Sequence, residues 1–218
     1  MENEISKKLA EHINGGREYR RTQNIEVRAG EDDEKVVTGY ACTFDEPYLL
    51  YDWGDYKIYE KVDRHAFDEC DMSDVIMQYD HEGRVFARKS NNTLKLETDA
   101  HGLRIEANLG GTAIGAQLYE EIKGGYTNKM SFGFRVEEDE QVRNELIVDG
   151  ITVVEIMRTI TKISKLYDVS AVSLPANDGT EISARSFVDG VIEELKAERL
   201  KEAERRRKIK ILKLMLED

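Results

Sequence analysis

Residues 129–136 read KMSFGFRV and residues 167–174 read YDVSAVSL. These two stretches are the clearest indication of the fold class. Both are short runs of mostly apolar and small residues, without the three- and four-residue apolar spacing of an amphipathic helix. Their length and composition are typical of buried strands. Each stretch therefore predicts a β-strand in the core of the protein.

Similar short runs occur along most of the chain. They are separated by turn-forming residues such as Asn91-Asn92 and Ala100-His101-Gly102. Further strands are predicted at 25–28, 36–44, 75–79, 85–87, 94–97, 103–107, 146–148 and 151–157. The acidic run 137–140 is interpreted as a solvated turn. This series predicts an α+β, mainly β protein whose antiparallel sheet closes as a barrel or a sandwich, with one or two inserted helices.

Two segments have the apolar spacing of helices. Residues 112–123 (TAIGAQLYEEIK) place apolar side chains on one face, with Thr112 as a candidate N-cap and Gly124-Gly125 at the end. Residues 1–17 place apolar side chains at four-residue spacing and then reach Gly15-Gly16. That pattern predicts an N-terminal leader that is either a short helix or a frayed segment.

Residues 188–218 differ in kind from the rest of the chain. From 189 to 218 the sequence has nine Lys or Arg and eight Asp or Glu, and apolar residues are concentrated only at 209–216. Strong helix formers without proline predict a charged helical tail outside the core. The chain therefore divides into a leader at 1–17, a core at 18–187 and this tail.

Composition and charge argue against several classes of protein. The 218 residues include 32 Lys and Arg against 44 Asp and Glu, a net charge of −12, which argues against a nucleic-acid-binding protein. The basic run 205–208 has acidic residues close by and is interpreted as a solvated helix face. Cys42 and Cys70 lack the spacing of metal ligands and are too few for a disulfide scaffold. Without a membrane-spanning run or a signal peptide, a soluble protein of a reducing compartment is expected.

Three residues are candidates for chemistry. Ser131 lies among small and apolar neighbours, including Gly133, that would let a substrate carbonyl approach. His81 follows the predicted strand at 75–79, where an imidazole could be held rigidly with one nitrogen exposed. Asp168 lies between apolar neighbours and needs a partner if it is buried, which an imidazolium would supply. On the residues alone, an ordinary strand serine, a turn histidine and a solvent-facing aspartate form the competing interpretation.

The chain lacks the common catalytic and cofactor-binding motifs. There is no GxSxG elbow, P-loop, dinucleotide-binding fingerprint, HExxH or CxxC. A metal site could use His65 and His81 with Asp63, Asp68 or Asp80, but their spacing matches no known ligand pattern. No metal and no cofactor is therefore expected.

An ordered series of short motifs resembles the caudoviral prohead maturation proteases. Each motif is loose by itself, but the ordered set is specific and spans roughly residues 18–186. In chain order the motifs are Tyr19-Arg20-Arg21, Gly39-Tyr40-Ala41 with Phe44, Glu60-Lys61-Val62, Ala66-Phe67, His81, Gly102-Leu103, Met130-Ser131-Phe132-Gly133-Phe134 and Asp168-Val169-Ser170-Ala171-Val172-Ser173-Leu174-Pro175-Ala176-Asn177. These proteases are similar to the herpesvirus assemblins, so the resemblance implies a closed antiparallel β-barrel surrounded by helices.

The resemblance implies a role for each candidate residue. Ser131 occupies the serine of the family's serine motif and would be the nucleophile of a serine endopeptidase, with His81 as its base. Asp168 occupies the acidic position of a second motif and would orient His81. The backbone amides of Phe132 and Gly133, or of another loop, would hold the oxyanion.

The chain departs from the family's pattern in two places. It has His65-Ala66-Phe67 where members usually have Gly-Ala-Phe, and residues 85–88 stand where members often have Leu-Gly-Arg. Because assemblins use a second histidine as the third member, His65 and His101 are alternatives to Asp168.

The resemblance also implies where the protein acts and on what. Its partners would be the major capsid protein, whose scaffold segment is cut, and itself, through autoprocessing and as a possible homo-oligomer. It would act inside the immature prohead in the host cytoplasm, with neither a membrane nor a nucleic acid as partner. The tail would target the protease into the shell and be removed later. The alternative is a non-catalytic capsid-assembly or scaffold protein that uses the same barrel for docking.

Overall fold

The computed structural model describes residues 17–24, 26–27, 35–53, 55–148 and 151–172, together with 191, 193, 196–198 and 200–209. Of the leader predicted at 1–17, only Arg17 is among these residues. The end of the strand predicted at 167–174 and the apolar end of the predicted tail after Ile209 lie outside them. In chain order the elements are β1 (Glu18–Asn24), β2 (Glu26–Val27), β3 (Val36–Thr43), β4 (Tyr48–Trp53), β5 (Tyr56–Val62), β6 (Ile76–Tyr79), β7 (Glu82–Arg88), η2 (Lys89–Asn91), β8 (Leu94–Thr98), β9 (Gly102–Asn108), α2 (Ala113–Lys123), β10 (Lys129–Val148) and β11 (Ile151–Val172). The protein is mainly β, as predicted.

The short predicted strands between 36 and 107 are confirmed as β3, β6, β7, β8 and β9. By contrast, β1, β4 and β5 were missed by the sequence analysis. In β5, buried and half-buried positions alternate along the strand, but the buried positions include Tyr56 and Glu60. Polar groups at core positions obscure the alternation of apolar and polar residues by which a strand is recognised.

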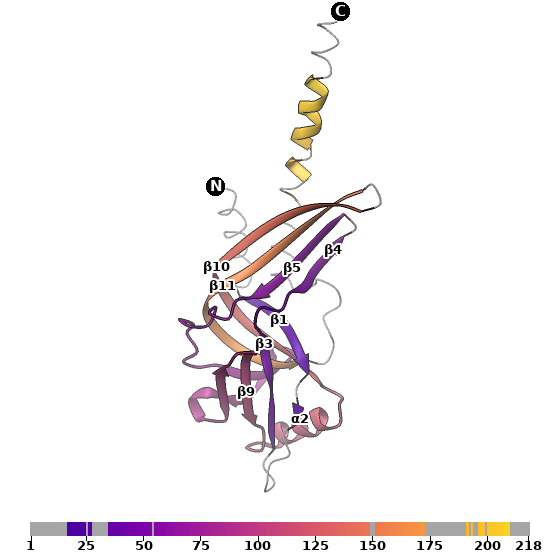
Figure 1. Ribbon diagram of the computed structural model, residues 1–218. Helices are drawn as coiled ribbons and strands as arrows, with labels where there is room; N and C mark the ends of the chain where they lie inside the picture. Colours follow the sequence, from indigo (N-terminus) through magenta and orange to yellow (C-terminus); the bar gives the residue numbers. More distant parts are fainter. Residues whose placement is uncertain are drawn as a thin grey trace, which may run out of the picture.

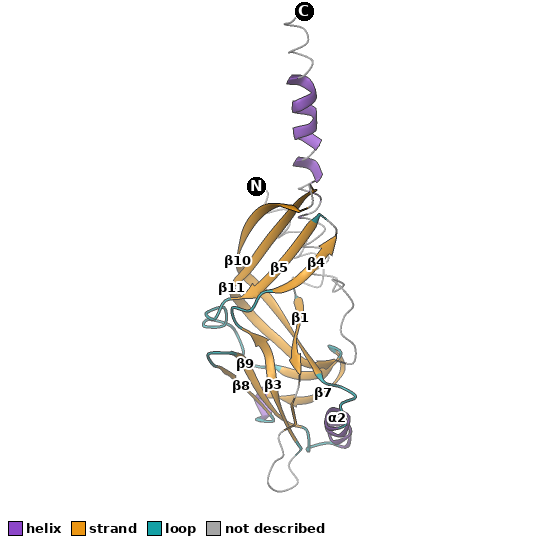
Figure 2. Ribbon diagram, turned by 45° about the vertical axis from the view of Figure 1, so that its right-hand side comes forward, coloured by secondary structure: helices purple, strands orange, loops and turns teal. Residues whose placement is uncertain are grey.

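The strands form two sheets, shown in two orientations in Figures 1 and 2. The seven-stranded sheet has the order β1-β10-β11-β5-β4, with β6 pairing a later stretch of β11 and with β7 beside β6. The four-stranded sheet has the order β2-β3-β9-β8. The larger sheet is an open half-barrel, so the described strands do not form the predicted closed barrel. After β1 the chain enters the second sheet, where β2 pairs with β3, and the edge strands β1 and β4 do not pair with each other.

A long hairpin of β10 and β11 runs through the larger sheet. The sequence predicts separate short strands here and a turn at 137–140, and the predicted turn is wrong. Residues 138–140 stay in β10 and pair with residues 159–162 of β11, while register shifts between Arg135 and Asp139 absorb the irregularity. Arg158 donates a hydrogen bond to the Asp139 carboxylate at 2.5 Å, and its positive charge balances the negative charge of Asp139 within the strand.

The helix predicted at 112–123 is confirmed as α2. The Thr112 hydroxyl accepts a hydrogen bond from the Gly115 backbone N–H, as an N-cap does, and the helix ends at Gly124. Leu118 and Ile122 are buried on the face that packs against the protein. Among the described helices, none is both long and apolar enough to cross a membrane.

The larger sheet packs one face against the main apolar core. Phe132 of β10 and Val169 of β11 are opposite each other in the register and belong to this core. Successive side chains of a strand point to opposite faces. Their neighbours Ser131 and Asp168 therefore point to the other face of the sheet.

Four buried charges, Glu18, Arg20, Glu60 and Arg158, tie β1 to β5 and β11, and we call them the buried ion cluster. Arg20 donates from Nε to Glu60 Oε1 at 2.5 Å, and Arg158 donates from Nη1 to Glu60 Oε2 at 2.8 Å. Arg158 also donates to Glu18 Oε2 at 2.9 Å. Since breaking one member of such a set leaves an uncompensated buried charge, the cluster holds β1 firmly on the sheet.

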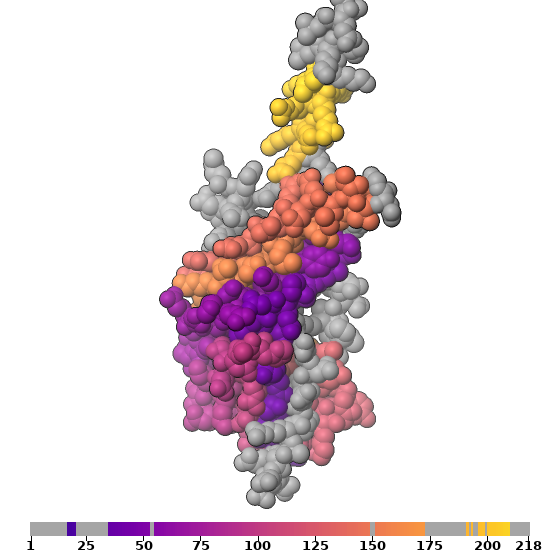
Figure 3. All heavy atoms as spheres, viewed as in Figure 1, coloured from indigo at the N-terminus to yellow at the C-terminus, as the bar shows by residue number. Residues whose placement is uncertain are grey.

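The described residues from 191 to 209 are helical, and their helix extends beyond the end of the hairpin in Figures 1 and 3. Most of their described side chains are exposed. Val191, by contrast, is 7% exposed and packs with Val154 and Ile156 in a second apolar cluster. The segment that the sequence analysis assigned to the tail therefore begins with a contact to the folded core.

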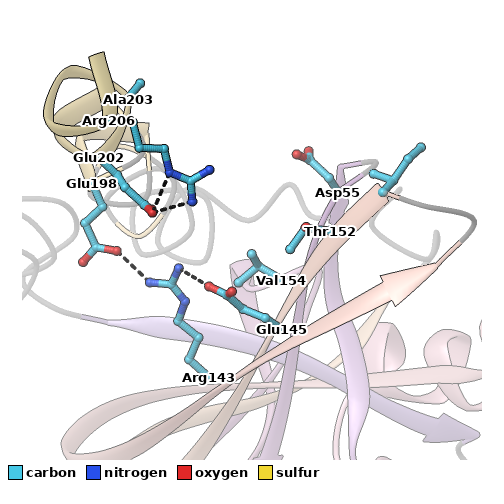
Figure 4. Close-up of a pocket in the computed structure, with 10 residues that line it drawn as sticks. Asp55, Arg143, Glu145, Thr152, Val154, Glu198, Glu202, Ala203 and Arg206 are labelled. Carbon is cyan, nitrogen blue, oxygen red and sulfur yellow. Dashed lines mark hydrogen bonds and ion pairs between the residues drawn. The ribbon is translucent and has the colours of Figure 1, made fainter. Parts of the chain in front are cut away.

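A groove separates this helix from the tip of the hairpin (Figure 4). It is lined by Asp55, Arg143, Glu145, Ile151, Thr152, Val154, Glu198, Glu202, Ala203 and Arg206. Arg143 donates to Glu145 at 2.8 Å and to Glu198 at 2.7 Å, and Arg206 donates to Glu202 at 2.6 Å. The groove lies at the opposite end of β10 from Ser131 and holds none of the three candidate residues.

Candidate active site

Ser131 lies near the start of β10, where this strand has β1 on one side and β11 on the other. Its side chain faces away from the apolar core, yet the residue is completely buried. In the register with β11, Ser131 is opposite Ser170 and Gly133 is opposite Asp168. Residues two apart in a strand share a face, so the hairpin brings Ser131 and Asp168 to one surface of the sheet.

His81 is delivered by the loop between β6 and β7. Strand β6 runs parallel to β11, with Ile76 beside Asp168, and the Asp80 N–H donates to the Ala171 carbonyl at 2.9 Å. Asp80 and His81 form the two-residue loop between the paired residues at its ends, with φ of 48° and 60°. Positive φ at both loop residues is the pattern of a type I′ hairpin turn, and outside glycine it is uncommon. The turn holds the imidazole over the face that carries Ser131.

The three side chains form one continuous line of hydrogen bonds. His81 Nε2 lies 2.6 Å from Ser131 Oγ, and His81 Nδ1 lies 2.5 Å from Asp168 Oδ1. The His81 side chain is 14% exposed and that of Asp168 is completely buried. A base between a hydroxyl and a carboxylate at these distances has the geometry of an activated serine nucleophile.

The surroundings of Asp168 favour its ionised form. Burial by itself would raise the pKa of this carboxyl, but the hydrogen bond and charge of His81, then the charge of Arg17 and the hydrogen bond from Ser170, hold the pKa below its ordinary value. Ser170 Oγ donates to Asp168 Oδ1 at 2.8 Å, and Arg17 Nη2 donates to Oδ2. An ionised carboxylate can only accept, so Nδ1 of His81 carries a proton and Nε2 of the neutral ring is free to accept from Ser131.

A comparison with models of protein families then gives the family. The model described as caudovirus prohead serine protease matches residues 23–194, which include all three of these residues. The chain belongs to this family. Comparisons with curated proteins and with solved structures found no match.

Two groups that bind Asp168 were not predicted from the sequence. Ser170 could have been found, because its spacing of two from Asp168 puts both on one face of a strand. Arg17 lies 151 residues away in the chain and had no local signal. Tyr19 was also missed as a neighbour of His81, although the two ring centroids are 4.2 Å apart.

The alternative histidines lie elsewhere in the protein. His65 Nδ1 is 2.9 Å from Asp68 on an exposed turn, where the His65 side chain is 72% exposed. The His101 ring packs edge-on against Tyr40 of the smaller sheet, with centroids 4.5 Å apart. Neither contacts His81, whose Nδ1 is already bound to Asp168.

Gly133 is required by the close approach of the Asp168 carboxylate. A Cβ at this position would lie 2.3 Å from Asp168 Oδ2, 2.8 Å from Tyr19 Cε1 and 2.9 Å from Arg17 Nε. All three distances are shorter than real Cβ contacts. The glycine of the serine motif therefore leaves room for the Asp168 carboxylate that binds His81.

The position of the oxyanion donors stays a prediction. At Phe132 and Gly133, strand β10 is paired on both sides, with Arg20 and Tyr19 of β1 and with residues 168–169 of β11. A strand in the interior of a sheet directs its amides into the two ladders. A donor role for either amide would require the ladder on that side to open when substrate binds.

The metal site considered from the sequence would use His65 and His81 with nearby aspartates. Over the residues that the structure describes, no group of three or more His, Cys, Asp or Glu side chains is placed to hold a metal ion.

Proposed function

We propose that the protein is a serine endopeptidase of prohead maturation in which Ser131 is the nucleophile, His81 the general base and Asp168 the residue that orients His81. The observation that carries this proposal is the unbroken hydrogen-bond line from Asp168 through His81 to Ser131. Membership of the prohead serine protease family supports the same chemistry.

The first chemical step is acylation. Ser131 Oγ attacks the carbonyl carbon of the scissile peptide while its proton passes to His81 Nε2, 2.6 Å away. The C=O π bond opens to an oxyanion, and the protonated His81 stays bound to Asp168 through Nδ1. The tetrahedral intermediate then collapses, the C–N bond breaks, and the Nε2 proton goes to the leaving amine.

The second step returns the enzyme to its starting state. Water gives a proton to His81 Nε2 and attacks the acyl carbon, and collapse of the second intermediate returns that proton to Ser131 Oγ as the acid product leaves. Throughout, Asp168 stays ionised, which its lowered pKa favours. No proton has to move to Asp168 for the cycle to close.

The proposed substrates are those of prohead maturation. We propose that the enzyme cuts the scaffold segment of the major capsid protein and its own chain, inside the immature prohead. The family description supports a role in prohead maturation.

A fluorophosphonate probe tests the proposed site. The full-length protein should be labelled at one residue, identified by peptide mass spectrometry as Ser131, and both Ser131→Ala and His81→Ala should abolish labelling. Ser164→Ala is the matched control, because Ser164 lies on β11 and its hydroxyl donates to the Arg135 carbonyl at 3.3 Å, away from the three candidate residues. A folded protein that the probe never labels would favour the non-catalytic assembly protein and contradict the proposal.

A further inference from the structure

Arg17 is bound to the candidate acid from the side opposite His81. It directly precedes β1, and its Nη2 donates to Asp168 Oδ2, while His81 and Ser170 take Oδ1. Its guanidinium lies over two aromatic rings, 4.6 Å from the centroid of Tyr167 and 5.1 Å from that of Tyr19. An arginine stacked on aromatic faces and bound to a carboxylate is held in one orientation.

Within the described part of the chain, the Arg17 guanidinium has few polar partners besides Asp168. Nε of Arg17 is buried and has no hydrogen-bond partner among the described residues. The charged end of the side chain is therefore held by Asp168 and by the two rings rather than by a wider network. The side chain is 25% exposed, so its charge is only partly shielded by water.

The backbone next to Arg17 is fixed from the other face of the sheet. Glu18 and Arg20 belong to the buried ion cluster, whose remaining members are on β5 and β11. Tyr19 is opposite Gly133 in the register with β10 and faces the candidate site. The start of β1 therefore places Arg17 beside Asp168 with little freedom to move.

A cation at Oδ2 has two consequences for His81. With Oδ1 and Oδ2 each bound to different partners, the carboxylate cannot rotate, and Oδ1 stays directed at Nδ1. The positive charge also offsets part of the charge of Asp168, which would otherwise favour the protonated imidazole. A base must be neutral to accept the Ser131 proton, so this offset widens the pH range in which His81 can act.

We propose that Arg17 is a positioning residue of this site, which orients the Asp168 carboxylate and sets the pH at which His81 becomes neutral. The inference rests on the proposed function for its importance to catalysis, but its physical content can be measured without turnover. Besides Arg17, the charged and titratable groups near His81 are Asp168 on β11, Tyr19 on β1, and Asp80 and Glu82 in and beside its own loop.

The test is an NMR titration of the full-length protein. The His81 imidazole signal is identified by its loss in His81→Gln, among only four histidines. Arg17→Met keeps a long unbranched side chain beside the two rings and removes the charge. The midpoint of the His81 titration should rise by about one pH unit, and fluorophosphonate labelling below the midpoint should slow by about tenfold.

Two further variants separate charge from packing. Arg17→Gln removes the charge but keeps a polar side chain, so it carries the same expectation and replaces Arg17→Met if that variant fails to fold. Arg17→Lys keeps the charge, so the midpoint of its His81 titration should lie close to that of the wild type. Arg104→Gln, a change of equal charge on β9 in the other sheet, should leave the midpoint where it is in the wild type.

The outcomes distinguish the inference from the proposed function. An unchanged His81 midpoint in a folded neutral variant would overturn the role of Arg17, even if wild-type labelling at Ser131 is normal. A raised midpoint with no labelling of any form would support the role of Arg17 and contradict the serine protease. A variant that only loses thermal stability, with its midpoint unchanged, would assign Arg17 a structural role alone.

Discussion

Replacing Gly133 by alanine adds one methyl group at the most crowded point of the site. That methyl would lie 2.3 Å from Asp168 Oδ2, whereas ordinary contacts begin at 3.4 Å, so the carboxylate must move by about 1 Å. Asp168 cannot yield freely, because His81, Ser170 and Arg17 all hold it. The methyl would also lie 2.8 Å from Tyr19 Cε1 and 2.9 Å from Arg17 Nε, so the substitution crowds these two neighbours as well as the acid, while the Ser131 and His81 side chains themselves are unchanged.

The size of the effect follows from the hydrogen-bond lengths. The contact between His81 Nδ1 and Asp168 Oδ1 is 2.5 Å, and lengthening it by about 1 Å would end it as a hydrogen bond. Misplacement of a reacting group by 1 Å costs about 10²-fold in rate, and loss of the orienting acid of a triad costs about 10⁴-fold. We therefore expect Gly133→Ala to lower the labelling rate by roughly 10²- to 10⁴-fold. The strain should lower the free energy of unfolding by about 1–3 kcal/mol.

The assay is the second-order rate of fluorophosphonate labelling per folded molecule, with unfolding measured in urea. Gly111→Ala is the neutral control, because nothing lies within 4 Å of its added methyl. Gly102→Ala is the control for strain, because its methyl would lie 2.0 Å from the Cys42 carbonyl oxygen in the smaller sheet. It should lose stability while its folded fraction keeps the wild-type rate.

One result would refute this reasoning. If folded Gly133→Ala is labelled at more than about a tenth of the wild-type rate, orientation of His81 by Asp168 contributes much less than a triad acid does. If the two strained variants lose rate equally, the loss reflects general strain rather than displacement of Asp168.

Three further predictions concern the acid, pH and the tail. Asp168→Asn should fold and be labelled more slowly than wild type without being inactive, since it disturbs the orientation and tautomer of His81; a wild-type rate would contradict the assigned role. Burial would raise the pKa of Glu60, but the charges of Arg20 and Arg158 lower it to about 2, below the 4.5 of an unperturbed glutamate. The ionised Glu60 therefore contributes on the order of 3 kcal/mol to the free energy of unfolding. This contribution is complete above pH 4.5 and is lost as the pH falls towards 2. The free energy of unfolding, measured in urea, should accordingly change less between pH 4.5 and pH 2 in Glu60→Gln than in the wild type. An equal change with pH in the two proteins would contradict the lowered pKa of Glu60. Removal of residues 188–218 takes away Val191 and should cost about 2 kcal/mol, while labelling at the active site persists and incorporation into proheads, followed by co-sedimentation, is lost; normal incorporation would contradict a targeting role.

Much of the local structure could be predicted because local residues specify it. The cap at Thr112 and the glycine at 124 bound α2, and the apolar stripe between them gives its buried face. The strands from β6 to β9 are short runs between turn residues, so their limits can be read from neighbouring residues. The turn predicted at 137–140 failed because the pairing of β10 with β11, which is set by distant residues, keeps an acidic run extended.

The candidate site divides in the same way. Ser131, His81 and Asp168 could be proposed because each lies in a motif that resembles the family, whereas the local setting of each residue left a non-catalytic interpretation open. Their meeting depends on the register of β10 with β11 and on the parallel pairing of β6 with β11. Those pairings join segments far apart in the chain, and no short-range pattern specifies them.

By itself the sequence determined that the protein is mainly β and contains the motifs of its family, and those motifs pointed to the three residues on which the proposed chemistry depends. Only the tertiary structure decided that the larger sheet stays an open half-barrel, and that Arg17 reaches Asp168 across 151 positions of the chain. It also decided why residue 133 is a glycine, because the group that excludes a side chain there belongs to the opposite strand. Propensity and periodicity act over a few residues, whereas the charge and volume around His81 are set by which strands become neighbours.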